Sequence, residues 1–303
     1  TSVNKKDVLA HLQNSKRIYD STAFLFLHKS LHKFKSYFSW KVLWAFIKFP
    51  SLHIFNTMHQ VNSRSLKDEK IVQLFNRFAT YNGSNPFKAP GILNIIPHLE
   101  FNKGAFFPDK GMYSISSSLY DLAVSEGVSF HFNSKVDEII VNAKSVSGVR
   151  IGSDIMDADL VVCNMDVHFV YHNLLPQIVR PKKILTQERS SSALIYYWGM
   201  KNEFPALDLH NIFFSADYEK EFACLSDKTQ ISDDPTVYVN ITSKKNKSDA
   251  PEKNENWFVM INVPSVENQD WDLLIANARK SIIQKLNNIL KVDIESMIIF
   301  EEF

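Results

Sequence analysis

Glycine is scarce in this chain, with 8 glycines among 303 residues, and no G-x-G-x-x-G turn occurs in it. Such a turn holds the pyrophosphate of a dinucleotide at the N-terminus of a helix. The chain by itself therefore lacks this phosphate cradle. Cysteine is also rare. Cys163 and Cys224 offer neither a disulfide framework nor a zinc-site spacing, a pattern typical of proteins from a reducing cytoplasm.

The sequence also lacks an excess of positive or negative charge, and it lacks long apolar runs. The formal net charge is +1, which gives no argument for nucleic-acid binding. No run of eighteen apolar residues is present, so the sequence predicts no transmembrane helix. His28 and His32 are four residues apart, but no glutamate lies between them and no third ligand follows, so we predict no metal site.

Aromatic residues, by contrast, are abundant between Ala23 and Phe55, and no acidic residue occurs between Asp20 and Asp68. Interleaved aromatic and basic residues suit a helix that lies at the headgroup level of an anionic membrane. The same pattern also fits a core helix whose lysines reach out to water. Both interpretations stay open. The first predicts a cytoplasmic protein that is peripherally associated with the inner face of the cell membrane.

Residues 104–176 carry the most informative pattern of the chain. Apolar residues at helical spacing, followed by Gly127, predict a helix over Tyr113–Ser125. Strands are expected at 129–132, 135–141 and 147–151. The apolar run Leu160–Cys163 predicts a strand covered on both faces, and it ends in the polar turn Asn164–Asp166. Ligands of open α/β sheets sit beyond the carboxyl ends of such strands.

The rest of the chain predicts a platform of strands and one long helix. β-Branched and aromatic residues indicate strands at 192–200, 211–215, 236–242, 257–263 and 296–300. Apolar residues on one face predict a helix over Leu273–Leu290. The polar stretch Ser243–Asn256 is expected to be an exposed, mobile loop.

Residues 104–176 also resemble the FAD-dependent carotenoid desaturases of the phytoene desaturase type in the order and spacing of their motifs. The matching residues are Gly111, Met112, Tyr113, Leu119, Leu122, Ala123, Gly127, Val128, Asn133, Val136, Ile139, Gly148, Val149, Ala158, Asp159, Val161, Val162, Asn164 and Asp166. One position departs from the pattern, because Lys110 stands where the family has the first glycine of a pair.

The resemblance implies an α/β fold with α+β character and an FAD-dependent flavoprotein architecture. A partial dinucleotide-binding domain would be joined to a substrate domain built of a mixed β-sheet and helices. We expect 1–103 to be a substrate-binding and membrane-associating helical part, 104–176 a part of the FAD-binding domain, and 177–303 the substrate-binding domain. The family's glycine-rich FAD segments lie outside this sequence, so we interpret the chain as an interior fragment that is inactive alone.

The resemblance further implies that FAD accepts a hydride from a carotenoid. Gly111 and Met112 would approach the flavin ring, Val136 would contact the adenine side through its backbone, and Asn164, Met165 and Asp166 would lie near the adenosine or pyrophosphate. No nucleic-acid partner is expected, and the sequence leaves the oligomeric state open.

Residues 71–107 look most similar to the branch of the family that acts on 1-hydroxylated acyclic carotenoids at the 3,4 bond. This stretch contains the polar side chains Arg77, Tyr81, His98 and Glu100. Arg77, His98 and Glu100 are the candidate catalytic residues at the polar end of an apolar pocket. Each of the four also fits a purely structural role.

Three other functions remain open from the sequence. The chain could belong to a phytoene desaturase, to a non-catalytic lipid- or carotenoid-binding module, or to another flavoprotein of the superfamily, such as a retinol saturase or an amine-oxidase relative.

Overall fold

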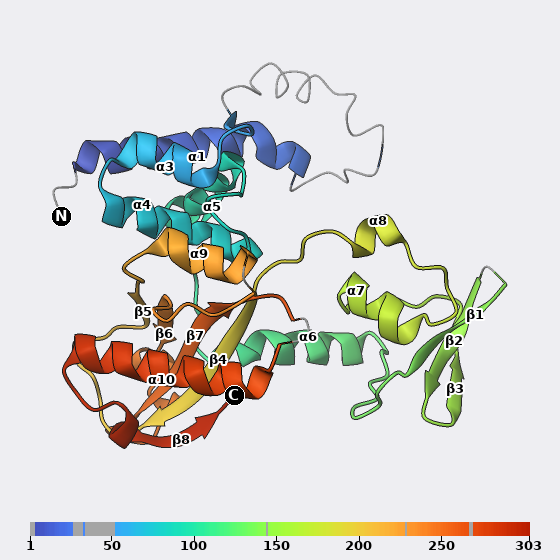
Figure 1. Cartoon of the computed structure of the whole chain (residues 1–303). Coiled ribbons are helices and arrows are strands. Elements are labelled where there is room, and N and C mark those ends of the chain that lie inside the picture. Colours follow the sequence, from blue (N-terminus) through green and yellow to red (C-terminus); the bar gives the residue numbers. More distant parts are fainter. Residues whose placement is uncertain (1–3, 27–32, 34–51, 144, 228, 267–268) are drawn as a thin grey trace. The chain divides into compact units, whose positions relative to one another are not determined.

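The computed structural model describes residues 4–26, 33, 52–143, 145–227, 229–266 and 269–303. By backbone contacts the chain forms two compact units (Figure 1). Unit 1 comprises the residues up to Met112 together with those from Ser190 onward, and unit 2 is Tyr113–Arg189. The predicted division into membrane-associating, FAD-binding and substrate-binding parts concerns function and stays a prediction. Most of the aromatic, basic segment 23–55 lies outside the described residues.

The first part of unit 1 is helical. It contains α1 (Lys5–Phe26), α3 (Met58–Leu66), α4 (Glu69–Asn76) and α5 (Ile95–His98). A capping box at Thr57 starts α3, and the side chain of Asp68 caps α4 by accepting hydrogen bonds from the backbone. Short helical turns η3 (Arg77–Asn82), η4 (Gly91–Asn94) and η5 (Leu99–Lys103) connect or extend these helices. Apolar side chains of α3, α4 and η3 pack together in one buried core. The members of this core include Met58, Leu66, Val72, Phe75 and Phe78.

The second part of unit 1 is a five-stranded sheet in the order β5-β6-β7-β4-β8, in which neighbouring strands are antiparallel. The strands are β4 (Ser192–Met200), β5 (His210–Phe213), β6 (Val237–Asn240), β7 (Glu255–Val263) and β8 (Ile298–Glu302). The helices of this part are α9 (Tyr218–Asp227) and α10 (Trp271–Leu290). Strand and helix predictions for this part are confirmed to within a few residues at each end.

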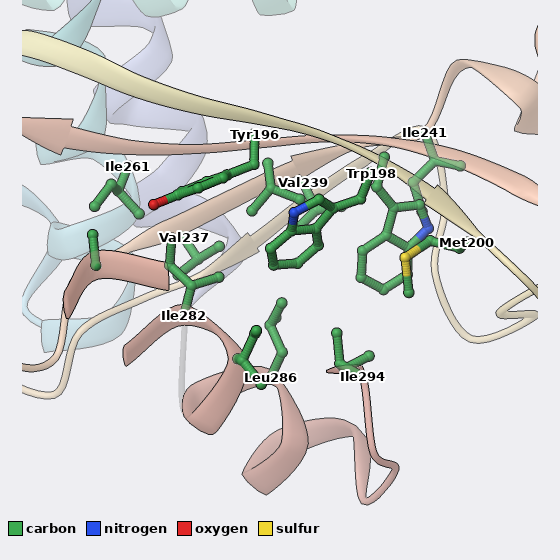
Figure 2. Packing of buried hydrophobic residues seen from close by; sticks show 14 of the residues in the cluster. Tyr196, Trp198, Met200, Val237, Val239, Ile241, Ile261, Ile282, Leu286 and Ile294 are labelled. Carbon is green, nitrogen blue, oxygen red and sulfur yellow. The ribbon is translucent and has the colours of Figure 1, made fainter. Parts of the chain in front are cut away.

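Helix α10 packs on one face of this sheet, as Figure 2 shows. Trp198 of β4 and Trp257 of β7 are each 1% exposed, and they share their core with Ile282 and Leu286 of α10. Because successive strand residues point to opposite faces, the buried positions alternate along β4 and along most of β7. The two tryptophans therefore anchor the sheet to the helix.

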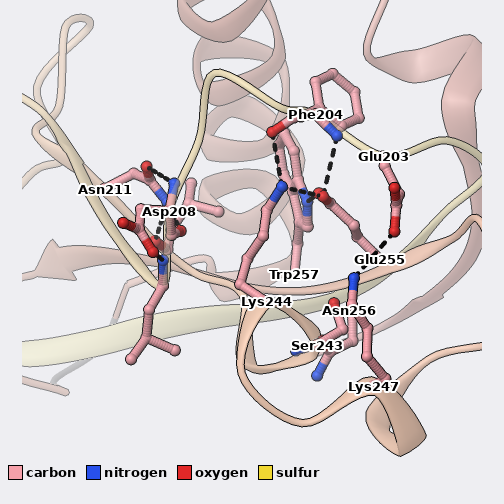
Figure 3. Close-up of polar contacts among 12 residues, drawn as sticks. Glu203, Phe204, Asp208, Asn211, Ser243, Lys244, Lys247, Glu255, Asn256 and Trp257 are labelled. Carbon is pink, nitrogen blue, oxygen red and sulfur yellow. Dashed lines mark hydrogen bonds and ion pairs between the residues drawn. The ribbon is translucent and has the colours of Figure 1, made fainter.

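The stretch 243–256 differs from the prediction of an exposed, mobile loop. It forms two short turns, η7 (Thr242–Lys244) and η8 (Lys247–Asp249), and then enters β7 (Figure 3). Lys244 Nζ lies 2.6 Å from the buried carboxylate of Glu255 and donates a hydrogen bond to the carbonyl of Phe204 over 2.8 Å. Trp257 Nε1 donates to the same carboxylate over 2.8 Å. Exposure is thus confirmed for residues 251–253 but not for the two ends of the stretch, because a buried ion pair needs a partner that composition does not reveal. Mobility stays a prediction.

Unit 2 contains α6 (Tyr113–Ser125), as predicted, and a three-stranded antiparallel sheet. The strands are β1 (Glu138–Asn142), β2 (Ser145–Ile151) and β3 (Asp154–Asp157), followed by α7 (Val167–Phe169), η6 (Val170–Leu174) and α8 (Lys182–Leu185). Within the described residues, no helix is long and apolar enough to cross a membrane.

Two predicted strands of unit 2 are wrong. Residues 129–132 and 160–163 form no strand. Leu160 is 79% exposed and Val162 is 87% exposed, although a covered strand was expected there. Strand assignment needs a neighbouring strand to supply hydrogen bonds, and none of the described strands pairs with these segments.

Candidate functional site

One face of the five-stranded sheet is left free of α10 and presents large side chains. Tyr197 of β4 pairs with Phe258 of β7, and in the next row Ile195 of β4, Met260 of β7 and Tyr238 of β6 lie side by side. These residues are half-buried, except for Tyr197, which is 49% exposed. We call this set, Ile195, Tyr197, Tyr238, Phe258 and Met260, the open face. Apolar and aromatic side chains of this kind suit a long apolar ligand.

Polar side chains gather near Tyr238 on the open face. Tyr81 of η3 donates a hydrogen bond to Glu100 Oε2 of η5 over 2.7 Å. Arg77 lowers and Glu100 raises the pKa of the phenols of both Tyr81 and Tyr238. We call Arg77, Tyr81, Glu100 and Tyr238 the polar cluster. Of the candidate catalytic residues, Glu100 is hydrogen-bonded to Tyr81, whereas Arg77 acts on the same phenol through its charge, and the catalytic role of each stays a prediction.

The backbone around Gly83 holds the polar cluster in place. Gly83 ends η3 in the left-handed region at φ +59°, and Ser191 donates a backbone hydrogen bond to its carbonyl over 3.0 Å. A Cβ at position 83 would lie 2.8 Å from the Cβ of Ser190. Any other residue here would strain the backbone and collide with the chain that leads into β4. Gly83 therefore ties η3, and with it Tyr81, to the sheet.

Arg77 is the buried member of the polar cluster. Its side chain is 91% buried, and its Nη1 makes no hydrogen bond within the described part of the chain. Its positive charge acts on Tyr218 and Glu221 of α9 as well as on Tyr81 and Tyr238. A guanidinium nitrogen that is enclosed in this way without a partner carries a desolvation cost.

Burial has consequences for the ionisation of the neighbouring groups. It raises the pKa of Tyr81 to about 12, helped by the hydrogen bond to Glu100 and by that carboxylate's charge, while Arg77 opposes the shift. Burial also raises the pKa of Tyr238, again against the influence of Arg77. Both phenols are therefore neutral at physiological pH and can donate hydrogen bonds. Burial raises the pKa of Glu221, whose carboxylate accepts bonds of 2.8 and 2.6 Å from Thr236.

His98 has its partners elsewhere. Its ring lies 4.8 Å from that of Tyr19 on α1, and its Nδ1 is 2.7 Å from the side-chain nitrogen of Asn102. Burial lowers the pKa of His98. These contacts direct the imidazole towards α1, so the geometry does not join His98 to the polar cluster. Its catalytic role stays a prediction.

Sequence reasoning missed the groups that surround Arg77 from α9 and β6. Glu221 is 1% exposed on the apolar face of α9, next to the buried Phe222. An acidic residue on an apolar helix face is a signal for a buried partner of opposite charge, and it could have been read from the sequence. The actual partner of Glu221, Thr236, which donates hydrogen bonds to the carboxylate from its backbone and its hydroxyl, could not have been read from the helix pattern, because it lies on the chain that leads into β6.

The residues expected to contact FAD are Gly111 and Met112 of unit 1 and Val136, Asn164, Met165 and Asp166 of unit 2. In unit 1, Gly111 has φ +77° and closes a turn by donating its N–H to Pro108 over 2.9 Å, and Met112 is 57% exposed. In unit 2, Val136 precedes β1, and its main-chain N–H and C=O make no hydrogen bond with other described residues. Asn164 and Met165 are exposed, and Asp166 caps α7 by accepting from His168 N over 2.8 Å. These roles stay predictions.

Residues 46–197 match the family described as flavin containing amine oxidoreductase. The chain belongs to this family. A solved structure of an oxidoreductase from Methanosarcina mazei has the same fold, with a TM-score of 0.56 at 14% identity over 90% of this chain and 63% of that one. The predicted fold class is confirmed.

Relatives of this amine oxidoreductase family member include carotenoid desaturases. The chain is 50% identical over 288 residues to a 1-hydroxycarotenoid 3,4-desaturase from Flavobacterium sp., covering 95% of this chain and 59% of that protein. It is 31% identical over 240 residues to a zeta-carotene-forming phytoene desaturase from Myxococcus xanthus, covering 77% and 46%. The chain thus spans about half to three-fifths of these relatives. The predicted resemblance is confirmed, and FAD is the implied cofactor.

Proposed function

We propose that this chain is part of an FAD-dependent carotenoid desaturase that introduces the 3,4 double bond into a 1-hydroxycarotenoid. The observation that carries the proposal is the 50% identity to a 1-hydroxycarotenoid 3,4-desaturase over 95% of the chain. The open face adds support, because a conjugated polyene needs a long apolar contact surface. Identity to the phytoene desaturase is much lower, which favours the hydroxylated substrate.

We infer that FAD contacts Val136, Asn164 and Met165, as the resemblance implies. In support, the backbone of Val136 makes no hydrogen bond with other described residues and can exchange hydrogen bonds with an adenine edge, and Asn164 and Met165 are exposed. When bound, FAD would supply the two-electron hydride acceptor for a desaturation in which the second hydrogen is lost to solvent as a proton.

The residues of this chain contribute alignment and exclusion of water. In this proposal, the open face contacts the polyene chain along its length, and Tyr197, Phe258 and Met260 displace water from it. The polar cluster supplies hydrogen-bonding groups at one end of that surface. Such a division orients an asymmetric substrate, because only one of its ends carries a polar group.

Pigment analysis tests the proposed reaction. The complete gene product would be produced in a strain that accumulates 1-hydroxylated acyclic carotenoids, and the pigments would be separated and their absorption recorded. We expect a product with one more conjugated double bond and a longer absorption wavelength, made by a yellow, FAD-containing protein. An unchanged pigment spectrum with FAD bound would contradict desaturation. Conversion of phytoene instead would support the phytoene desaturase alternative. A colourless, FAD-free protein would favour the non-catalytic binding module.

We also propose that the protein attaches peripherally to the cytoplasmic face of the cell membrane. The support is the aromatic, basic sequence between Ala23 and Phe55, together with the lipid solubility of the proposed substrate. Co-sedimentation with vesicles tests this proposal. We expect binding to vesicles that contain an anionic phospholipid, weaker binding to vesicles of phosphatidylcholine alone, and release by salt. Absence of the protein from both vesicle pellets would contradict it.

A further inference from the structure

The open face continues beyond its apolar part to a polar edge on β5. One row of side chains crosses the sheet and consists of His210 (β5), Asn240 (β6), Phe258 (β7) and Tyr197 (β4). The ring of Tyr238 stacks on His210 at 6.0 Å and meets that of Phe258 at 6.4 Å, and Tyr197 meets Phe258 at 5.6 Å. Because neighbouring strands are about 4.8 Å apart, the three spacings from β5 to β4 cover about 14 Å. An elongated apolar ligand that follows this row ends at His210.

Two hydrogen bonds fix the imidazole of His210. The hydroxyl of Tyr238 lies 2.7 Å from Nδ1, and Nδ2 of Asn240 lies 3.2 Å from the same nitrogen. A further bond establishes the orientation of this amide, because Nδ2 also donates to the carbonyl of Leu209 over 2.9 Å. An amide nitrogen only donates, so Nδ1 is the acceptor of both bonds, and the proton of the neutral ring is on Nε2.

The Nε2–H group of His210 is a donor that a ligand can reach. The side chain is exposed, and Nε2 makes no hydrogen bond within the described part of the chain. Glu302 of β8 lies at the opposite end of the same row, beside Tyr197, and is exposed as well. No hydrogen bond to another described residue holds its carboxylate in one orientation. His210 is thus the end of the row that is oriented before a ligand arrives, and such preorganisation lowers the cost of binding.

We infer that His210 binds the hydroxyl at the end of a linear polyene that lies on the open face, and that it determines the preference for hydroxylated over non-hydroxylated substrates. The inference rests on the proposed function and names a residue that sets its substrate class. Nε2–H donates to the hydroxyl oxygen, while Tyr238 and Asn240 are positioning residues that hold Nδ1. A polyene without the hydroxyl would cover Nε2–H and replace its hydrogen bond to water with nothing, which disfavours that substrate.

Binding selectivity tests this inference separately from turnover. The complete, FAD-loaded protein would be titrated with a 1-hydroxylated acyclic carotenoid and with the same carotenoid lacking the hydroxyl, and quenching of protein fluorescence would give the two Kd values. We expect tighter binding of the hydroxylated compound by the wild type. His210→Asn should reduce this preference roughly fivefold, because the asparagine amide reaches the place of Nδ1 and leaves no donor at the place of Nε2. His210→Gln should keep most of the preference, because its amide nitrogen reaches the place of Nε2.

Glu302→Gln is the matched control at the opposite end of the row. We expect it to keep the ratio of the two Kd values. Tyr238→Phe should lower the preference less than His210→Asn does, because it loosens the imidazole without removing Nε2. Thermal unfolding of each variant would verify that the fold is retained, and His210→Ala takes the place of His210→Asn if the latter does not fold.

Three results would overturn the inference. They are equal binding of both carotenoids by the wild type, the same ratio in His210→Asn as in the wild type, and equal losses in His210→Asn and His210→Gln. A loss in Glu302→Gln alone would place the hydroxyl at β8 and would overturn it too. Selective binding that depends on His210, without desaturated product, would contradict the proposed function and leave the inference standing. Product formation with an unchanged ratio in His210→Asn would do the reverse.

Discussion

At the scale of single residues, unit 1 contains buried polar groups at several points. Arg77 and Glu221 lie on different elements, and the charge of Arg77 acts on Glu221. His11 on α1 is 1% exposed, and its Nδ1 is 2.8 Å from Ser65 Oγ on α3. Its ring meets that of Phe75 edge-on at 4.7 Å. Buried ionisable groups of this kind couple the stability of the fold to pH.

The burial of His11 predicts how the stability of the fold depends on pH. Burial lowers its pKa from about 6.5 to about 4, with a smaller contribution from His53 in the same direction. As the pH falls, the unfolded chain therefore binds a proton at His11 before the folded chain does. The stability that depends on a neutral His11 is present above pH 6.5 and is lost towards pH 4. We expect the free energy of unfolding to fall by about 3 kcal/mol over this range.

The measurement is urea unfolding at a series of pH values. His11→Gln should remove most of this particular loss, whereas His131→Gln, a change at an exposed position of unit 2, should leave the slope as in the wild type. Parallel slopes for wild type and His11→Gln between pH 6.5 and 4 would speak against a neutral buried imidazole.

At the scale of elements, β7 carries two roles on alternate residues. Ile261 is fully buried against the α10 side, and it pairs with Leu194 and Val237. Met260, its neighbour in sequence, lies on the open face between Ile195 and Tyr238. One set of β7 side chains thus packs on the α10 side of the sheet, and the other set lies on the open face. This division follows from the two-residue repeat of a strand.

We expect Ile261→Ala to lower the free energy of unfolding by about 2–5 kcal/mol, because it leaves a cavity in the core between sheet and helix. Met260→Ala should cause a markedly smaller loss, because its side chain is only half-buried. Chemical denaturation of both variants measures the difference. A larger loss for Met260→Ala would mean that the open face is a second core.

The same elements show what could be predicted from the sequence. The bounds of α6 and β4 were predicted correctly because local periodicity determines them. The strand at 160–163 was not, because coverage of an apolar strand depends on chain that is distant in sequence. Arg77 and Glu100 were found as polar residues in an apolar context. The hydrogen bond of Tyr81 to Glu100, and the separation of His98 from it, depend on how η3 and η5 fold back on one another.

At the scale of the whole molecule, the two units differ in how much apolar surface they bury. The buried apolar residues of unit 2 are Ile139 and Leu174 among the described positions, whereas the core between the sheet and α10 in unit 1 contains both tryptophans of the central strands. In unit 2, large side chains such as Leu119, Leu160 and Val162 are exposed. Stability within a chain follows the local density of such burial.

Hydrogen exchange followed by mass spectrometry checks this difference. We expect amides of β4, β7 and α10 to exchange slowest and those of β1 and β2 to exchange faster by about an order of magnitude or more, because local opening there exposes less apolar surface. Binding of FAD should slow exchange around Val136 if the proposed contact forms. Equal protection of β2 and β7 would contradict the expected order.

The alternation along β7 has a consequence for how such a protein can change over generations. Substitutions at Phe258 or Met260 alter what the sheet presents, while Val259 and Ile261 keep the helix attached. Mutations that broaden or shift the range of accepted molecules are therefore largely uncoupled from mutations that threaten folding. Substitutions at these positions can change which ligands the protein accepts without first requiring stabilising mutations elsewhere. The strand is therefore a site at which new ligand preferences can evolve.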